Sequence, residues 1–476
     1  MPETKAFDFK ANISKALADK QLGRNLKSAM GGLRVKRQAV FADADELAAL
    51  RAQGEAIKQR ALSRLPELLT QLEAKCTANG IQVHWAETVE EANRTVLNIM
   101  RRHAADLMVK GKSMLSEEMG LNHYLEDQGL EVLETDLGEF IIQLAGEPPS
   151  HIIVPAVHKN RDQIAHIFQE KIPDTPYTED VDELNGIARR TLRRKFFDGQ
   201  VGLSGVNFAV AETGTLCLVE NEGNGRMCTT VPPVHIAVMG LEKVVEKLEE
   251  VPPLLRLLTG SATGQLITTY FNMITSPRRP GEKDGPHEVH LLILDNGRSA
   301  ILDDPELRKS LQCIRCGTCL NHCPVYVRIG GHAYGFVYPG PIGEVITPQF
   351  EGLEKAGELA SASSLCQACG EVCPVQIPLP DLIRRMRREG VGQGEDCCVQ
   401  GFGSKRRLAE TLAWKAWALL NRHPRLNALN NMVLGRIGNR MPRLGPLAAW
   451  TTGRTAPRFA PKSLHQLADQ EGLPRD

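Results

Sequence analysis

The sequence predicts an α/β domain with a mostly parallel sheet, then a small α-helical cysteine-rich domain and a helical basic C-terminal region. Two observations lead to this fold class. Between residues 81 and 154, strand-like and helix-like stretches alternate with short connections, the pattern of a parallel sheet covered by helices. After residue 305 the alternation stops and seven cysteines follow at close spacing. With 476 residues, 42% of them hydrophobic, the chain is long enough for two to four globular domains.

The first 80 residues are predicted to be helical. Apolar residues recur there at three- to four-residue or seven-residue steps along one helical face, namely Leu47, Leu50, Ile57, Ala61 and Leu65. Pro66 is placed to begin a second helix, and Gly80 to end it.

The sheet begins after Gly80. Strands are expected at 81–85, 107–110, 131–135 and 151–154. The first helix between them follows a capping box of Thr88 and Glu91, and the next two are expected at 116–125 and 138–144.

The sheet is expected to continue to a domain end near residue 300. The charged segment 173–194 is expected to contain an inserted helix. Two strand-like runs follow, joined by a glycine turn, and two later apolar runs should complete the sheet: 206–211, 215–220, 235–239 and 289–294.

Two cysteine runs carry the chemistry. The first has the spacing C-x2-C-x2-C-x3-C-P, by which bacterial ferredoxins bind [4Fe–4S] clusters, and consists of Cys313, Cys316, Cys319 and Cys323. The second lacks its first cysteine and consists of Cys366, Cys369 and Cys373. Ser363 stands at the vacant position, so seven cysteines face the eight ligand positions of two clusters.

In such runs the cysteine next to proline binds the other cluster. The predicted ligands of the first cluster are therefore Cys313, Cys316, Cys319 and Cys373. The second is predicted to have only three cysteine ligands: Cys323, Cys366 and Cys369. Its last iron is then bound by Ser363, by water, by another chain or by a substrate, or it is absent and leaves a [3Fe–4S] cluster.

Zinc is the competing interpretation of paired C-x2-C groups. Structural zinc sites seldom use the order of the first run, and four-ligand sites would leave three cysteines over. Two adjacent clusters give a path for single electrons, so the pattern predicts electron transfer. The chain has no G-x-G-x-x-G fingerprint for a dinucleotide, which favours a partner protein as the site of substrate oxidation.

Other candidate residues have weaker signals. The segment 110–113, with Lys110 and Lys112, follows a strand and precedes a helix, so it is either an anion-binding loop or a solvated one. Glu212 and Glu220 flank the glycine turn as active-site or surface carboxylates. Three side chains between the cluster ligands could line a pocket or pack against the clusters: His332, Tyr334 and Tyr338.

Composition limits the remaining functions. Lys plus Arg and Asp plus Glu are 57 each, which gives no general argument for nucleic-acid binding. No secretory signal or membrane-spanning run is present, so a cytoplasmic protein is expected, in which disulfides are disfavoured. The basic tail from residue 384, with Trp414, Trp417 and Trp450, could dock a partner or touch a membrane surface, or it could be a solvated helical face.

Together these motifs resemble the LutB/YkgF family of lactate-utilisation iron–sulfur proteins along nearly the whole chain. The resemblance rests on 109–113, 133–139, 211–215, 313–324, 330–334, 338–343 and 366–374. The serine at 363 also matches that family.

The resemblance implies a LUD domain of NagB/RpiA/CoA-transferase-like fold, a two-cluster ferredoxin-like module and a family-specific C-terminal region. The implied boundaries are 1–80, 81–300, 301–385 and 386–476. It further implies that this chain carries electrons in the oxidation of L-lactate to pyruvate, together with companions of LutA and LutC type. Two alternatives stay open: the LUD domain could itself act on an anionic metabolite, or the chain could be a scaffold.

Overall fold

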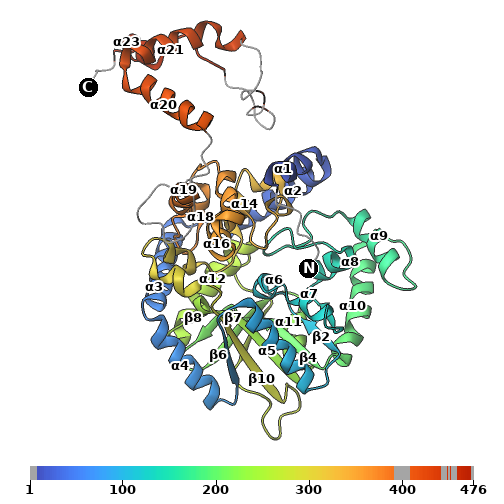
Figure 1. The fold of residues 1–476 in the computed structure, drawn as a ribbon. Helices are drawn as coiled ribbons and strands as arrows, with labels where there is room; N and C mark the ends of the chain where they lie inside the picture. The colour runs from blue at the N-terminus through green and yellow to red at the C-terminus, as the bar shows by residue number, and fades with distance from the viewer. Residues whose placement is uncertain (1–7, 391–407, 441–447, 449–450, 452–457, 473–476) are drawn as a thin grey trace. The chain divides into compact units, whose positions relative to one another are not determined.

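The structure is a computed structural model that describes residues 8–390, 408–440, 448, 451 and 458–472. The chain divides into two compact units, Met1–Phe402 and Gly403–Asp476. In the first unit, Figure 1 shows α3 and α4 along one side of the sheets and α9 and α10 along the opposite side.

The main sheet is parallel, as predicted, and it has six strands, of which the one at Val201–Gly205 was not predicted. In spatial order they are β1 (Gln82–Ala86), β10 (Glu288–Leu294), β7 (Val234–Gly240), β4 (Val201–Gly205), β2 (Leu107–Lys110) and β3 (Glu131–Glu134). Every residue of β7 is buried, because helices and loops cover both faces of the sheet.

Helices on the two faces of the main sheet enclose separate cores. One core is formed with α5 (Val89–Arg102), α6 (Met114–Glu118) and α7 (Leu121–Glu126). Another involves α8 (Leu137–Ala145), α9 (Arg161–Lys171), α10 (Val181–Asp198) and α11 (Asn224–Thr230). The predicted helix at 116–125 is interrupted at Gly120, whose φ of 58° ends α6. Half of the predicted capping box is present: Thr88 Oγ1 accepts the Glu91 N–H at 3.3 Å, but the Glu91 carboxylate accepts the N–H of Glu87 and not that of Thr88.

A second sheet, which the sequence did not reveal, holds two of the predicted strands. Its order is β8 (Val244–Val245), β5 (Phe208–Val210), β6 (Thr215–Glu220) and β9 (Tyr270–Ile274). β5 and β6 are antiparallel and are joined through Gly214 at φ 70°. A Cβ at Gly214 would lie 2.9 Å from the backbone of Lys75 and Cys76, so the turn requires glycine.

The strand predicted at 151–154 is wrong. This segment forms bends, and the buried His151 accepts the N–H groups of Ile153 and Val154 on Nδ1 at 3.0 and 3.2 Å. A side chain thus takes the backbone donors that a neighbouring strand would have bonded. The apolar residues of the run are packed against the cysteine-rich part of the chain instead of a strand.

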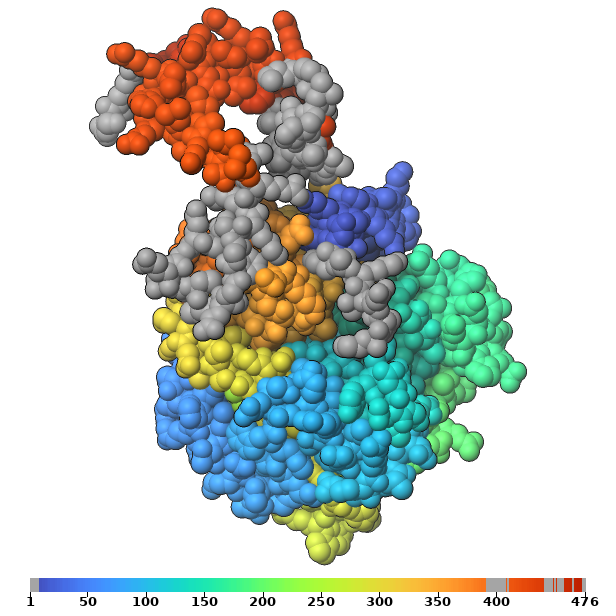
Figure 2. Space-filling model, in the orientation of Figure 1, coloured from blue at the N-terminus to red at the C-terminus, as the bar shows by residue number. Residues whose placement is uncertain are grey.

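The N-terminal helices and the cysteine-rich segment share one core. The N-terminal helices are α1 (Phe9–Ala18), α2 (Lys20–Val40), α3 (Ala44–Ser63) and α4 (Leu65–Ala78). Residues of η1 (Leu241–Lys243) and α12 (Val251–Ala262) also belong to this core, and η2 (Leu248–Glu250) directly precedes α12. α1 and α2 contact helices of the cysteine-rich segment, and in Figure 2 their blue surface borders its orange surface. The helical prediction is confirmed for the described part of residues 1–80.

We call residues 298–390 the cysteine module. Its short helices are α13 (Arg298–Asp303), η3 (Leu307–Gln312), α14 (Thr318–His322), α15 (Tyr326–Ile329), η4 (His332–Tyr334), α16 (Gly340–Glu351), α17 (Leu353–Ala356), η5 (Gly357–Ala362), α18 (Ala368–Val372) and α19 (Leu379–Gly390). The helix predicted after Pro380 is confirmed as α19. The glycine-rich stretch before α16 contains only the single turn η4.

The second unit is helical, as predicted for the basic tail. It contains α20 (Leu408–Arg422), α21 (Pro424–Ile437), η6 (Gly438–Arg440) and α23 (Leu464–Gln470). Trp414 and Trp417 are both exposed on α20 and form an edge-to-face pair. Cys397, Cys398 and Trp450 lie outside the described residues. None of the helices in the described ranges combines the length and apolarity needed to cross a membrane.

Candidate functional site

The cysteines of the two runs lie in two neighbouring groups. The first cysteine group lines one small cavity and consists of Cys313, Cys316, Cys319 and Cys373. The second cysteine group consists of Cys323, Cys366 and Cys369. The pKa of Cys369 is raised to about 12, chiefly by burial, and the thiols of Cys323 and Cys366 contribute to the increase. The two groups are close to each other: Cys369 of the second group also raises the pKa of the buried Cys319 of the first.

The surroundings of the first cysteine group suit a thiolate-bound metal cluster. The cavity is otherwise lined by backbone and mostly apolar side chains such as Ile152, Ile342 and Leu379, and no carboxylate or imidazole is among its described lining residues. Burial raises the pKa of Cys373 to about 11, and Cys313 contributes to the increase. Four such thiols are soft donors that lose their protons only to a metal, which fits an iron–sulfur cluster.

The two cysteine runs repeat one backbone conformation. In the first run Arg315 has φ 60° and Gly317 has φ 71°; in the second, Leu365 has φ 53° and Gln367 has φ 71°. One-turn helices follow in both, and these helices, α14 and α18, pack against each other. A left-handed conformation is costly for arginine, leucine and glutamine, so its repetition indicates a shared structural demand.

No sequence pattern indicated Glu344, which lies beside the second cysteine group. It raises the pKa of both Cys323 and Cys369, after the larger effect of burial. Glu344 is fully buried, and neither of its carboxyl oxygens has a hydrogen-bond partner within the described residues. Burial raises its own pKa to about 8. The carboxyl lies beside these cysteines because segments that are distant in the sequence pack together, so no local pattern predicts it.

A larger cavity of about 340 Å³ lies at the carboxyl ends of the parallel strands, and we call it the strand-end cavity. Gly111, Gly205 and Gly240 border it where β2, β4 and β7 end. Arg315 and Tyr338 of the cysteine module close it, and Figure 1 places that module over this end of the main sheet. Ligands of open α/β sheets bind at such strand ends.

The predicted anion loop is only partly available to a ligand. Lys110 is fully buried and pairs with Glu117 at 2.7 Å and with Glu134, and it does not line the strand-end cavity. Lys112 does line it, and its nearest charged partner is Glu139 at 3.1 Å. Lys110 is therefore a structural residue.

The two predicted glutamates differ. Glu212 accepts the Leu248 N–H at 3.3 Å and lies outside the strand-end cavity. Glu220 lines the cavity, but its oxygens accept the N–H groups of Gly225 and Arg226 at 2.6 and 2.7 Å. It helps to shape the loop before α11.

The three candidate residues between the cluster ligands also differ in their positions. His332 bonds the carbonyl of Pro148 at 2.8 Å, and Tyr334 is fully buried. Only Tyr338 reaches the strand-end cavity, where its hydroxyl donates to Glu118 at 2.7 Å.

The sequence did not single out Lys243, Glu242, Arg298 or Arg315 in the strand-end cavity. They come from η1, α13 and the first cysteine run, so no local spacing links them. Arg315 alone had a usable signal, since it stands between two cluster ligands.

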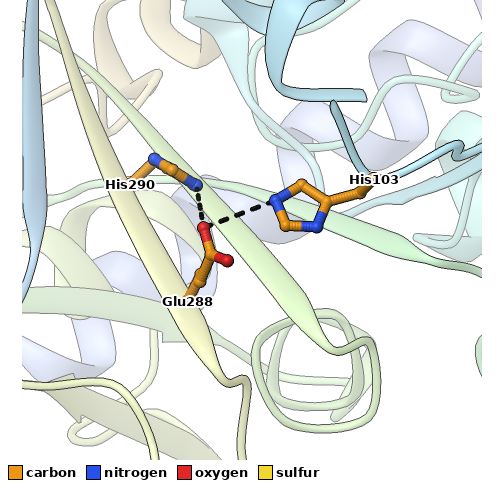
Figure 3. A group of neighbouring side chains, drawn as sticks. All are labelled: His103, Glu288 and His290. Atoms are coloured by element: carbon orange, nitrogen blue, oxygen red, sulfur yellow. Dashed lines mark ion pairs between the residues drawn. The ribbon is translucent and has the colours of Figure 1, made fainter. Parts of the chain in front are cut away.

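Figure 3 shows a separate group of residues that could hold a metal ion. Glu288 Oε2 lies 3.4 Å from Nε2 of His103 and 3.5 Å from Nε2 of His290. Glu288 begins β10, at the opposite end of that strand from the strand-end cavity. The group is therefore remote from the cysteines and from the cavity.

Three segments of the chain match described protein families. Residues 69–294 match the LUD domain, residues 309–377 the 4Fe-4S dicluster domain and residues 385–473 the C-terminal domain of lactate utilisation protein B. The boundaries of these matches leave the N-terminal helices largely outside any of the three.

Full-length relatives are also similar. The chain is 42% identical over 466 residues to the Escherichia coli protein described as an uncharacterised electron transport protein, YkgF, covering 96% of this chain and 95% of the relative. It is 41% identical over 457 residues to lactate utilization protein B of Bacillus licheniformis, covering 94% of each chain. With that of Bacillus thuringiensis the identity is 44% over 415 residues, 85% of this chain and 84% of the relative.

Among solved structures, a DUF162 family protein from Deinococcus radiodurans is 14% identical. The match covers 48% of this chain and 98% of the other, with a TM-score of 0.28, too low to support a shared fold.

Proposed function

Because the chain belongs to the lactate utilisation protein B family, we propose that it is the iron–sulfur electron-transfer subunit of an L-lactate-oxidising complex. In this proposal companion subunits of LutA and LutC type complete the complex, and a companion removes the electrons as lactate becomes pyruvate. The observation that carries the proposal is the pair of adjoining cysteine groups, since two neighbouring clusters form a path for single electrons.

The proposed ligands of the first cluster are the four residues of the first cysteine group, Cys313, Cys316, Cys319 and Cys373. The proposed ligands of the second are Cys323, Cys366 and Cys369, with Ser363 as the fourth. The clusters supply one-electron oxidation and reduction, while the protein holds their thiolates and shields them from water. Cys366 is exposed, so the second cluster is the one closer to solvent and to a partner.

Iron and acid-labile sulfide analysis with EPR spectroscopy of the anaerobically purified chain tests the cofactor. We expect about eight irons, or about seven with a [3Fe–4S] centre, following the ligand count. Zinc in place of iron would refute the proposal.

Reconstitution tests the role. Lactate should reduce the clusters only when the companion subunits are added, and the chain alone should leave them oxidised. If lactate reduced a dye in the presence of this chain alone, the result would contradict a purely electron-transferring role and would indicate that the LUD domain itself is the catalyst.

A further inference from the structure

We propose that the strand-end cavity is a binding site for a small organic carboxylate, held by Lys243 and Arg315, two residues that also lie near Cys313 of the first cysteine group. This assigns a ligand to the LUD domain of the chain itself, which goes beyond carrying electrons for a companion. The charge of the ligand follows from the side chains of the cavity and does not depend on the role in lactate oxidation.

The cavity has the room and the position of a ligand site. Its volume of about 340 Å³ lies in the range of small-molecule pockets. Glycine is needed at its wall, because a Cβ at Gly240 would lie 2.2 Å from Glu242 Oε2 and 2.5 Å from Arg298 Nε. The backbone there is held close to a buried charged network.

Arg298 in this network already has its counter-ions. Its guanidinium donates to Glu118 at 2.8 and 2.9 Å and to Glu242 at 2.8 Å, and its side chain is 1% exposed. It is therefore a fixed part of the wall, with no charge left for a ligand.

Two further cations are not neutralised in this way. Among the residues that the structure describes, the only carboxylate paired with Arg315 is the already paired Glu242, at 3.6 Å, and Nη1 of Arg315 is buried without a hydrogen-bond acceptor. Lys243 has no hydrogen bond or ion pair to any residue that the structure describes. Lys58 is also nearby and donates to the Glu242 carbonyl at 2.5 Å, so four cations face the two carboxylates of Glu118 and Glu242.

Lys243 and Arg315 are half-buried, and leaving two such cations without an anion is unfavourable, because partial burial removes much of the water that would stabilise them. A carboxylate in the cavity would supply one charge and two acceptor oxygens, which matches one ammonium and one free guanidinium nitrogen.

The acidic residues of the cavity wall argue against a multiply charged ligand. The lining also includes the carboxylates of Asp136, Glu220 and Glu222 and the amides of Asn207, Asn221 and Asn224. These groups would repel a phosphate dianion but can bond hydroxyl or carbonyl groups. The ligand class is therefore a small monocarboxylate with a further polar group.

A competing explanation is that Lys243 and Arg315 only balance the negative thiolates, since both interact with Cys313. The two explanations make different predictions. Charge balance predicts an effect of Lys243 on the cluster alone, whereas a ligand site predicts saturable carboxylate binding that depends on Lys243.

Isothermal titration calorimetry on the full, cluster-loaded chain tests the proposal, with L-lactate, pyruvate and inorganic phosphate as separate probes. We expect saturable binding of at least one carboxylate, and none of phosphate at that site. Lys243→Gln should weaken carboxylate binding by about ten- to a hundred-fold, the loss of one charged hydrogen bond. Lys243→Arg should restore part of it. Lys283→Gln, at an exposed lysine of the same domain, is the matched control and should bind like the wild type.

Iron content and EPR spectra of each variant establish that the clusters are intact. Unchanged carboxylate affinity in Lys243→Gln would overturn the proposal, as would stronger binding of phosphate or no saturable carboxylate binding to the wild type. The proposed electron-transfer function is tested separately. It would still hold in each of these cases if the clusters are intact and accept electrons through the companion subunits.

Discussion

Ser363 in the second cysteine run has the backbone setting of Cys313 in the first. The N–H of Leu365 donates to Ser363 Oγ at 3.1 Å, just as the N–H of Arg315 donates to Cys313 Sγ at 3.4 Å. Both residues precede a left-handed residue by two positions. The serine therefore presents an oxygen where the first run presents a sulfur.

Replacing Ser363 by cysteine should complete the second cysteine group. Because the backbone is already that of Cys313, we expect Ser363→Cys to bind a fourth iron more firmly and to lose any [3Fe–4S] EPR signal that air produces in the wild type. Iron analysis and EPR before and after brief air exposure measure this. Ser364→Cys, at the exposed neighbour, should behave like the wild type. Equal air sensitivity in both variants would show that Ser363 is not aimed at the cluster.

Glu344 provides a test of the alternative ligand. Its buried carboxyl lacks hydrogen-bond partners among the described residues, and such a group costs about 1–3 kcal/mol. If Ser363 is the fourth ligand, Glu344→Met should raise the free energy of unfolding by up to about that amount and leave the iron content unchanged. Denaturant unfolding and iron analysis measure the two quantities. Loss of iron from Glu344→Met, with none from Ser363→Ala, would assign the ligand to Glu344 instead.

The chain should lose stability in mild acid through buried histidines of the main sheet. Burial, with a smaller effect of His290, lowers the pKa of His235 to about 3 from its usual 6.5. Between these values the unfolded chain binds a proton that the folded chain does not. The stability present above pH 6.5 is therefore lost as pH falls towards 3, at about 1.4 kcal/mol per pH unit for one histidine.

Unfolding midpoints between pH 7.5 and 5 measure this loss. His235→Gln should flatten the pH dependence over that range, whereas His123→Gln, at a side chain that is 92% exposed, should not change it. The same slope in all three proteins would contradict the account. Ser204 Oγ lies 2.8 Å from His235 Nε2 and is the polar partner that the glutamine can retain.

Local sequence patterns predicted the parallel sheet and the cysteine runs. The second sheet, the bends at 151–154 and the residues of the strand-end cavity depend on contacts between distant segments, which such patterns do not show. Val109 and Leu291 lie in short apolar runs whose length and flanks indicate strands. The apolar run after His151 has the same composition, but its N–H groups bond the histidine ring and not a strand. No sequence pattern indicated Lys243, because the residues around it come partly from η1 and partly from the cysteine module, which are far apart in the sequence. The predicted domain boundaries at 80, 300 and 385 stay a proposal.

The two clusters should differ in reduction potential, because the charges around the two cysteine groups differ. Five cations interact with the first group: Arg37, Arg51, Lys58, Lys243 and Arg315. The second group has the carboxyl of Glu344 beside it. Positive charge stabilises the reduced form, so we expect the first cluster to have the higher potential.

Arg51 is the cation with which to test this difference. Its Nε donates to the Cys373 carbonyl at 3.0 Å, so it lies against a ligand of the first cluster without lining the strand-end cavity. Arg51→Gln keeps a donor and removes the charge, and should lower the potential of the first cluster by on the order of 50 mV with little change in the second. EPR-monitored redox titration resolves the two. Arg384→Gln, whose side chain is 74% exposed on α19, is the control that should leave both potentials unchanged. A shift of the second cluster alone would mean that the charge difference does not set the order of the potentials.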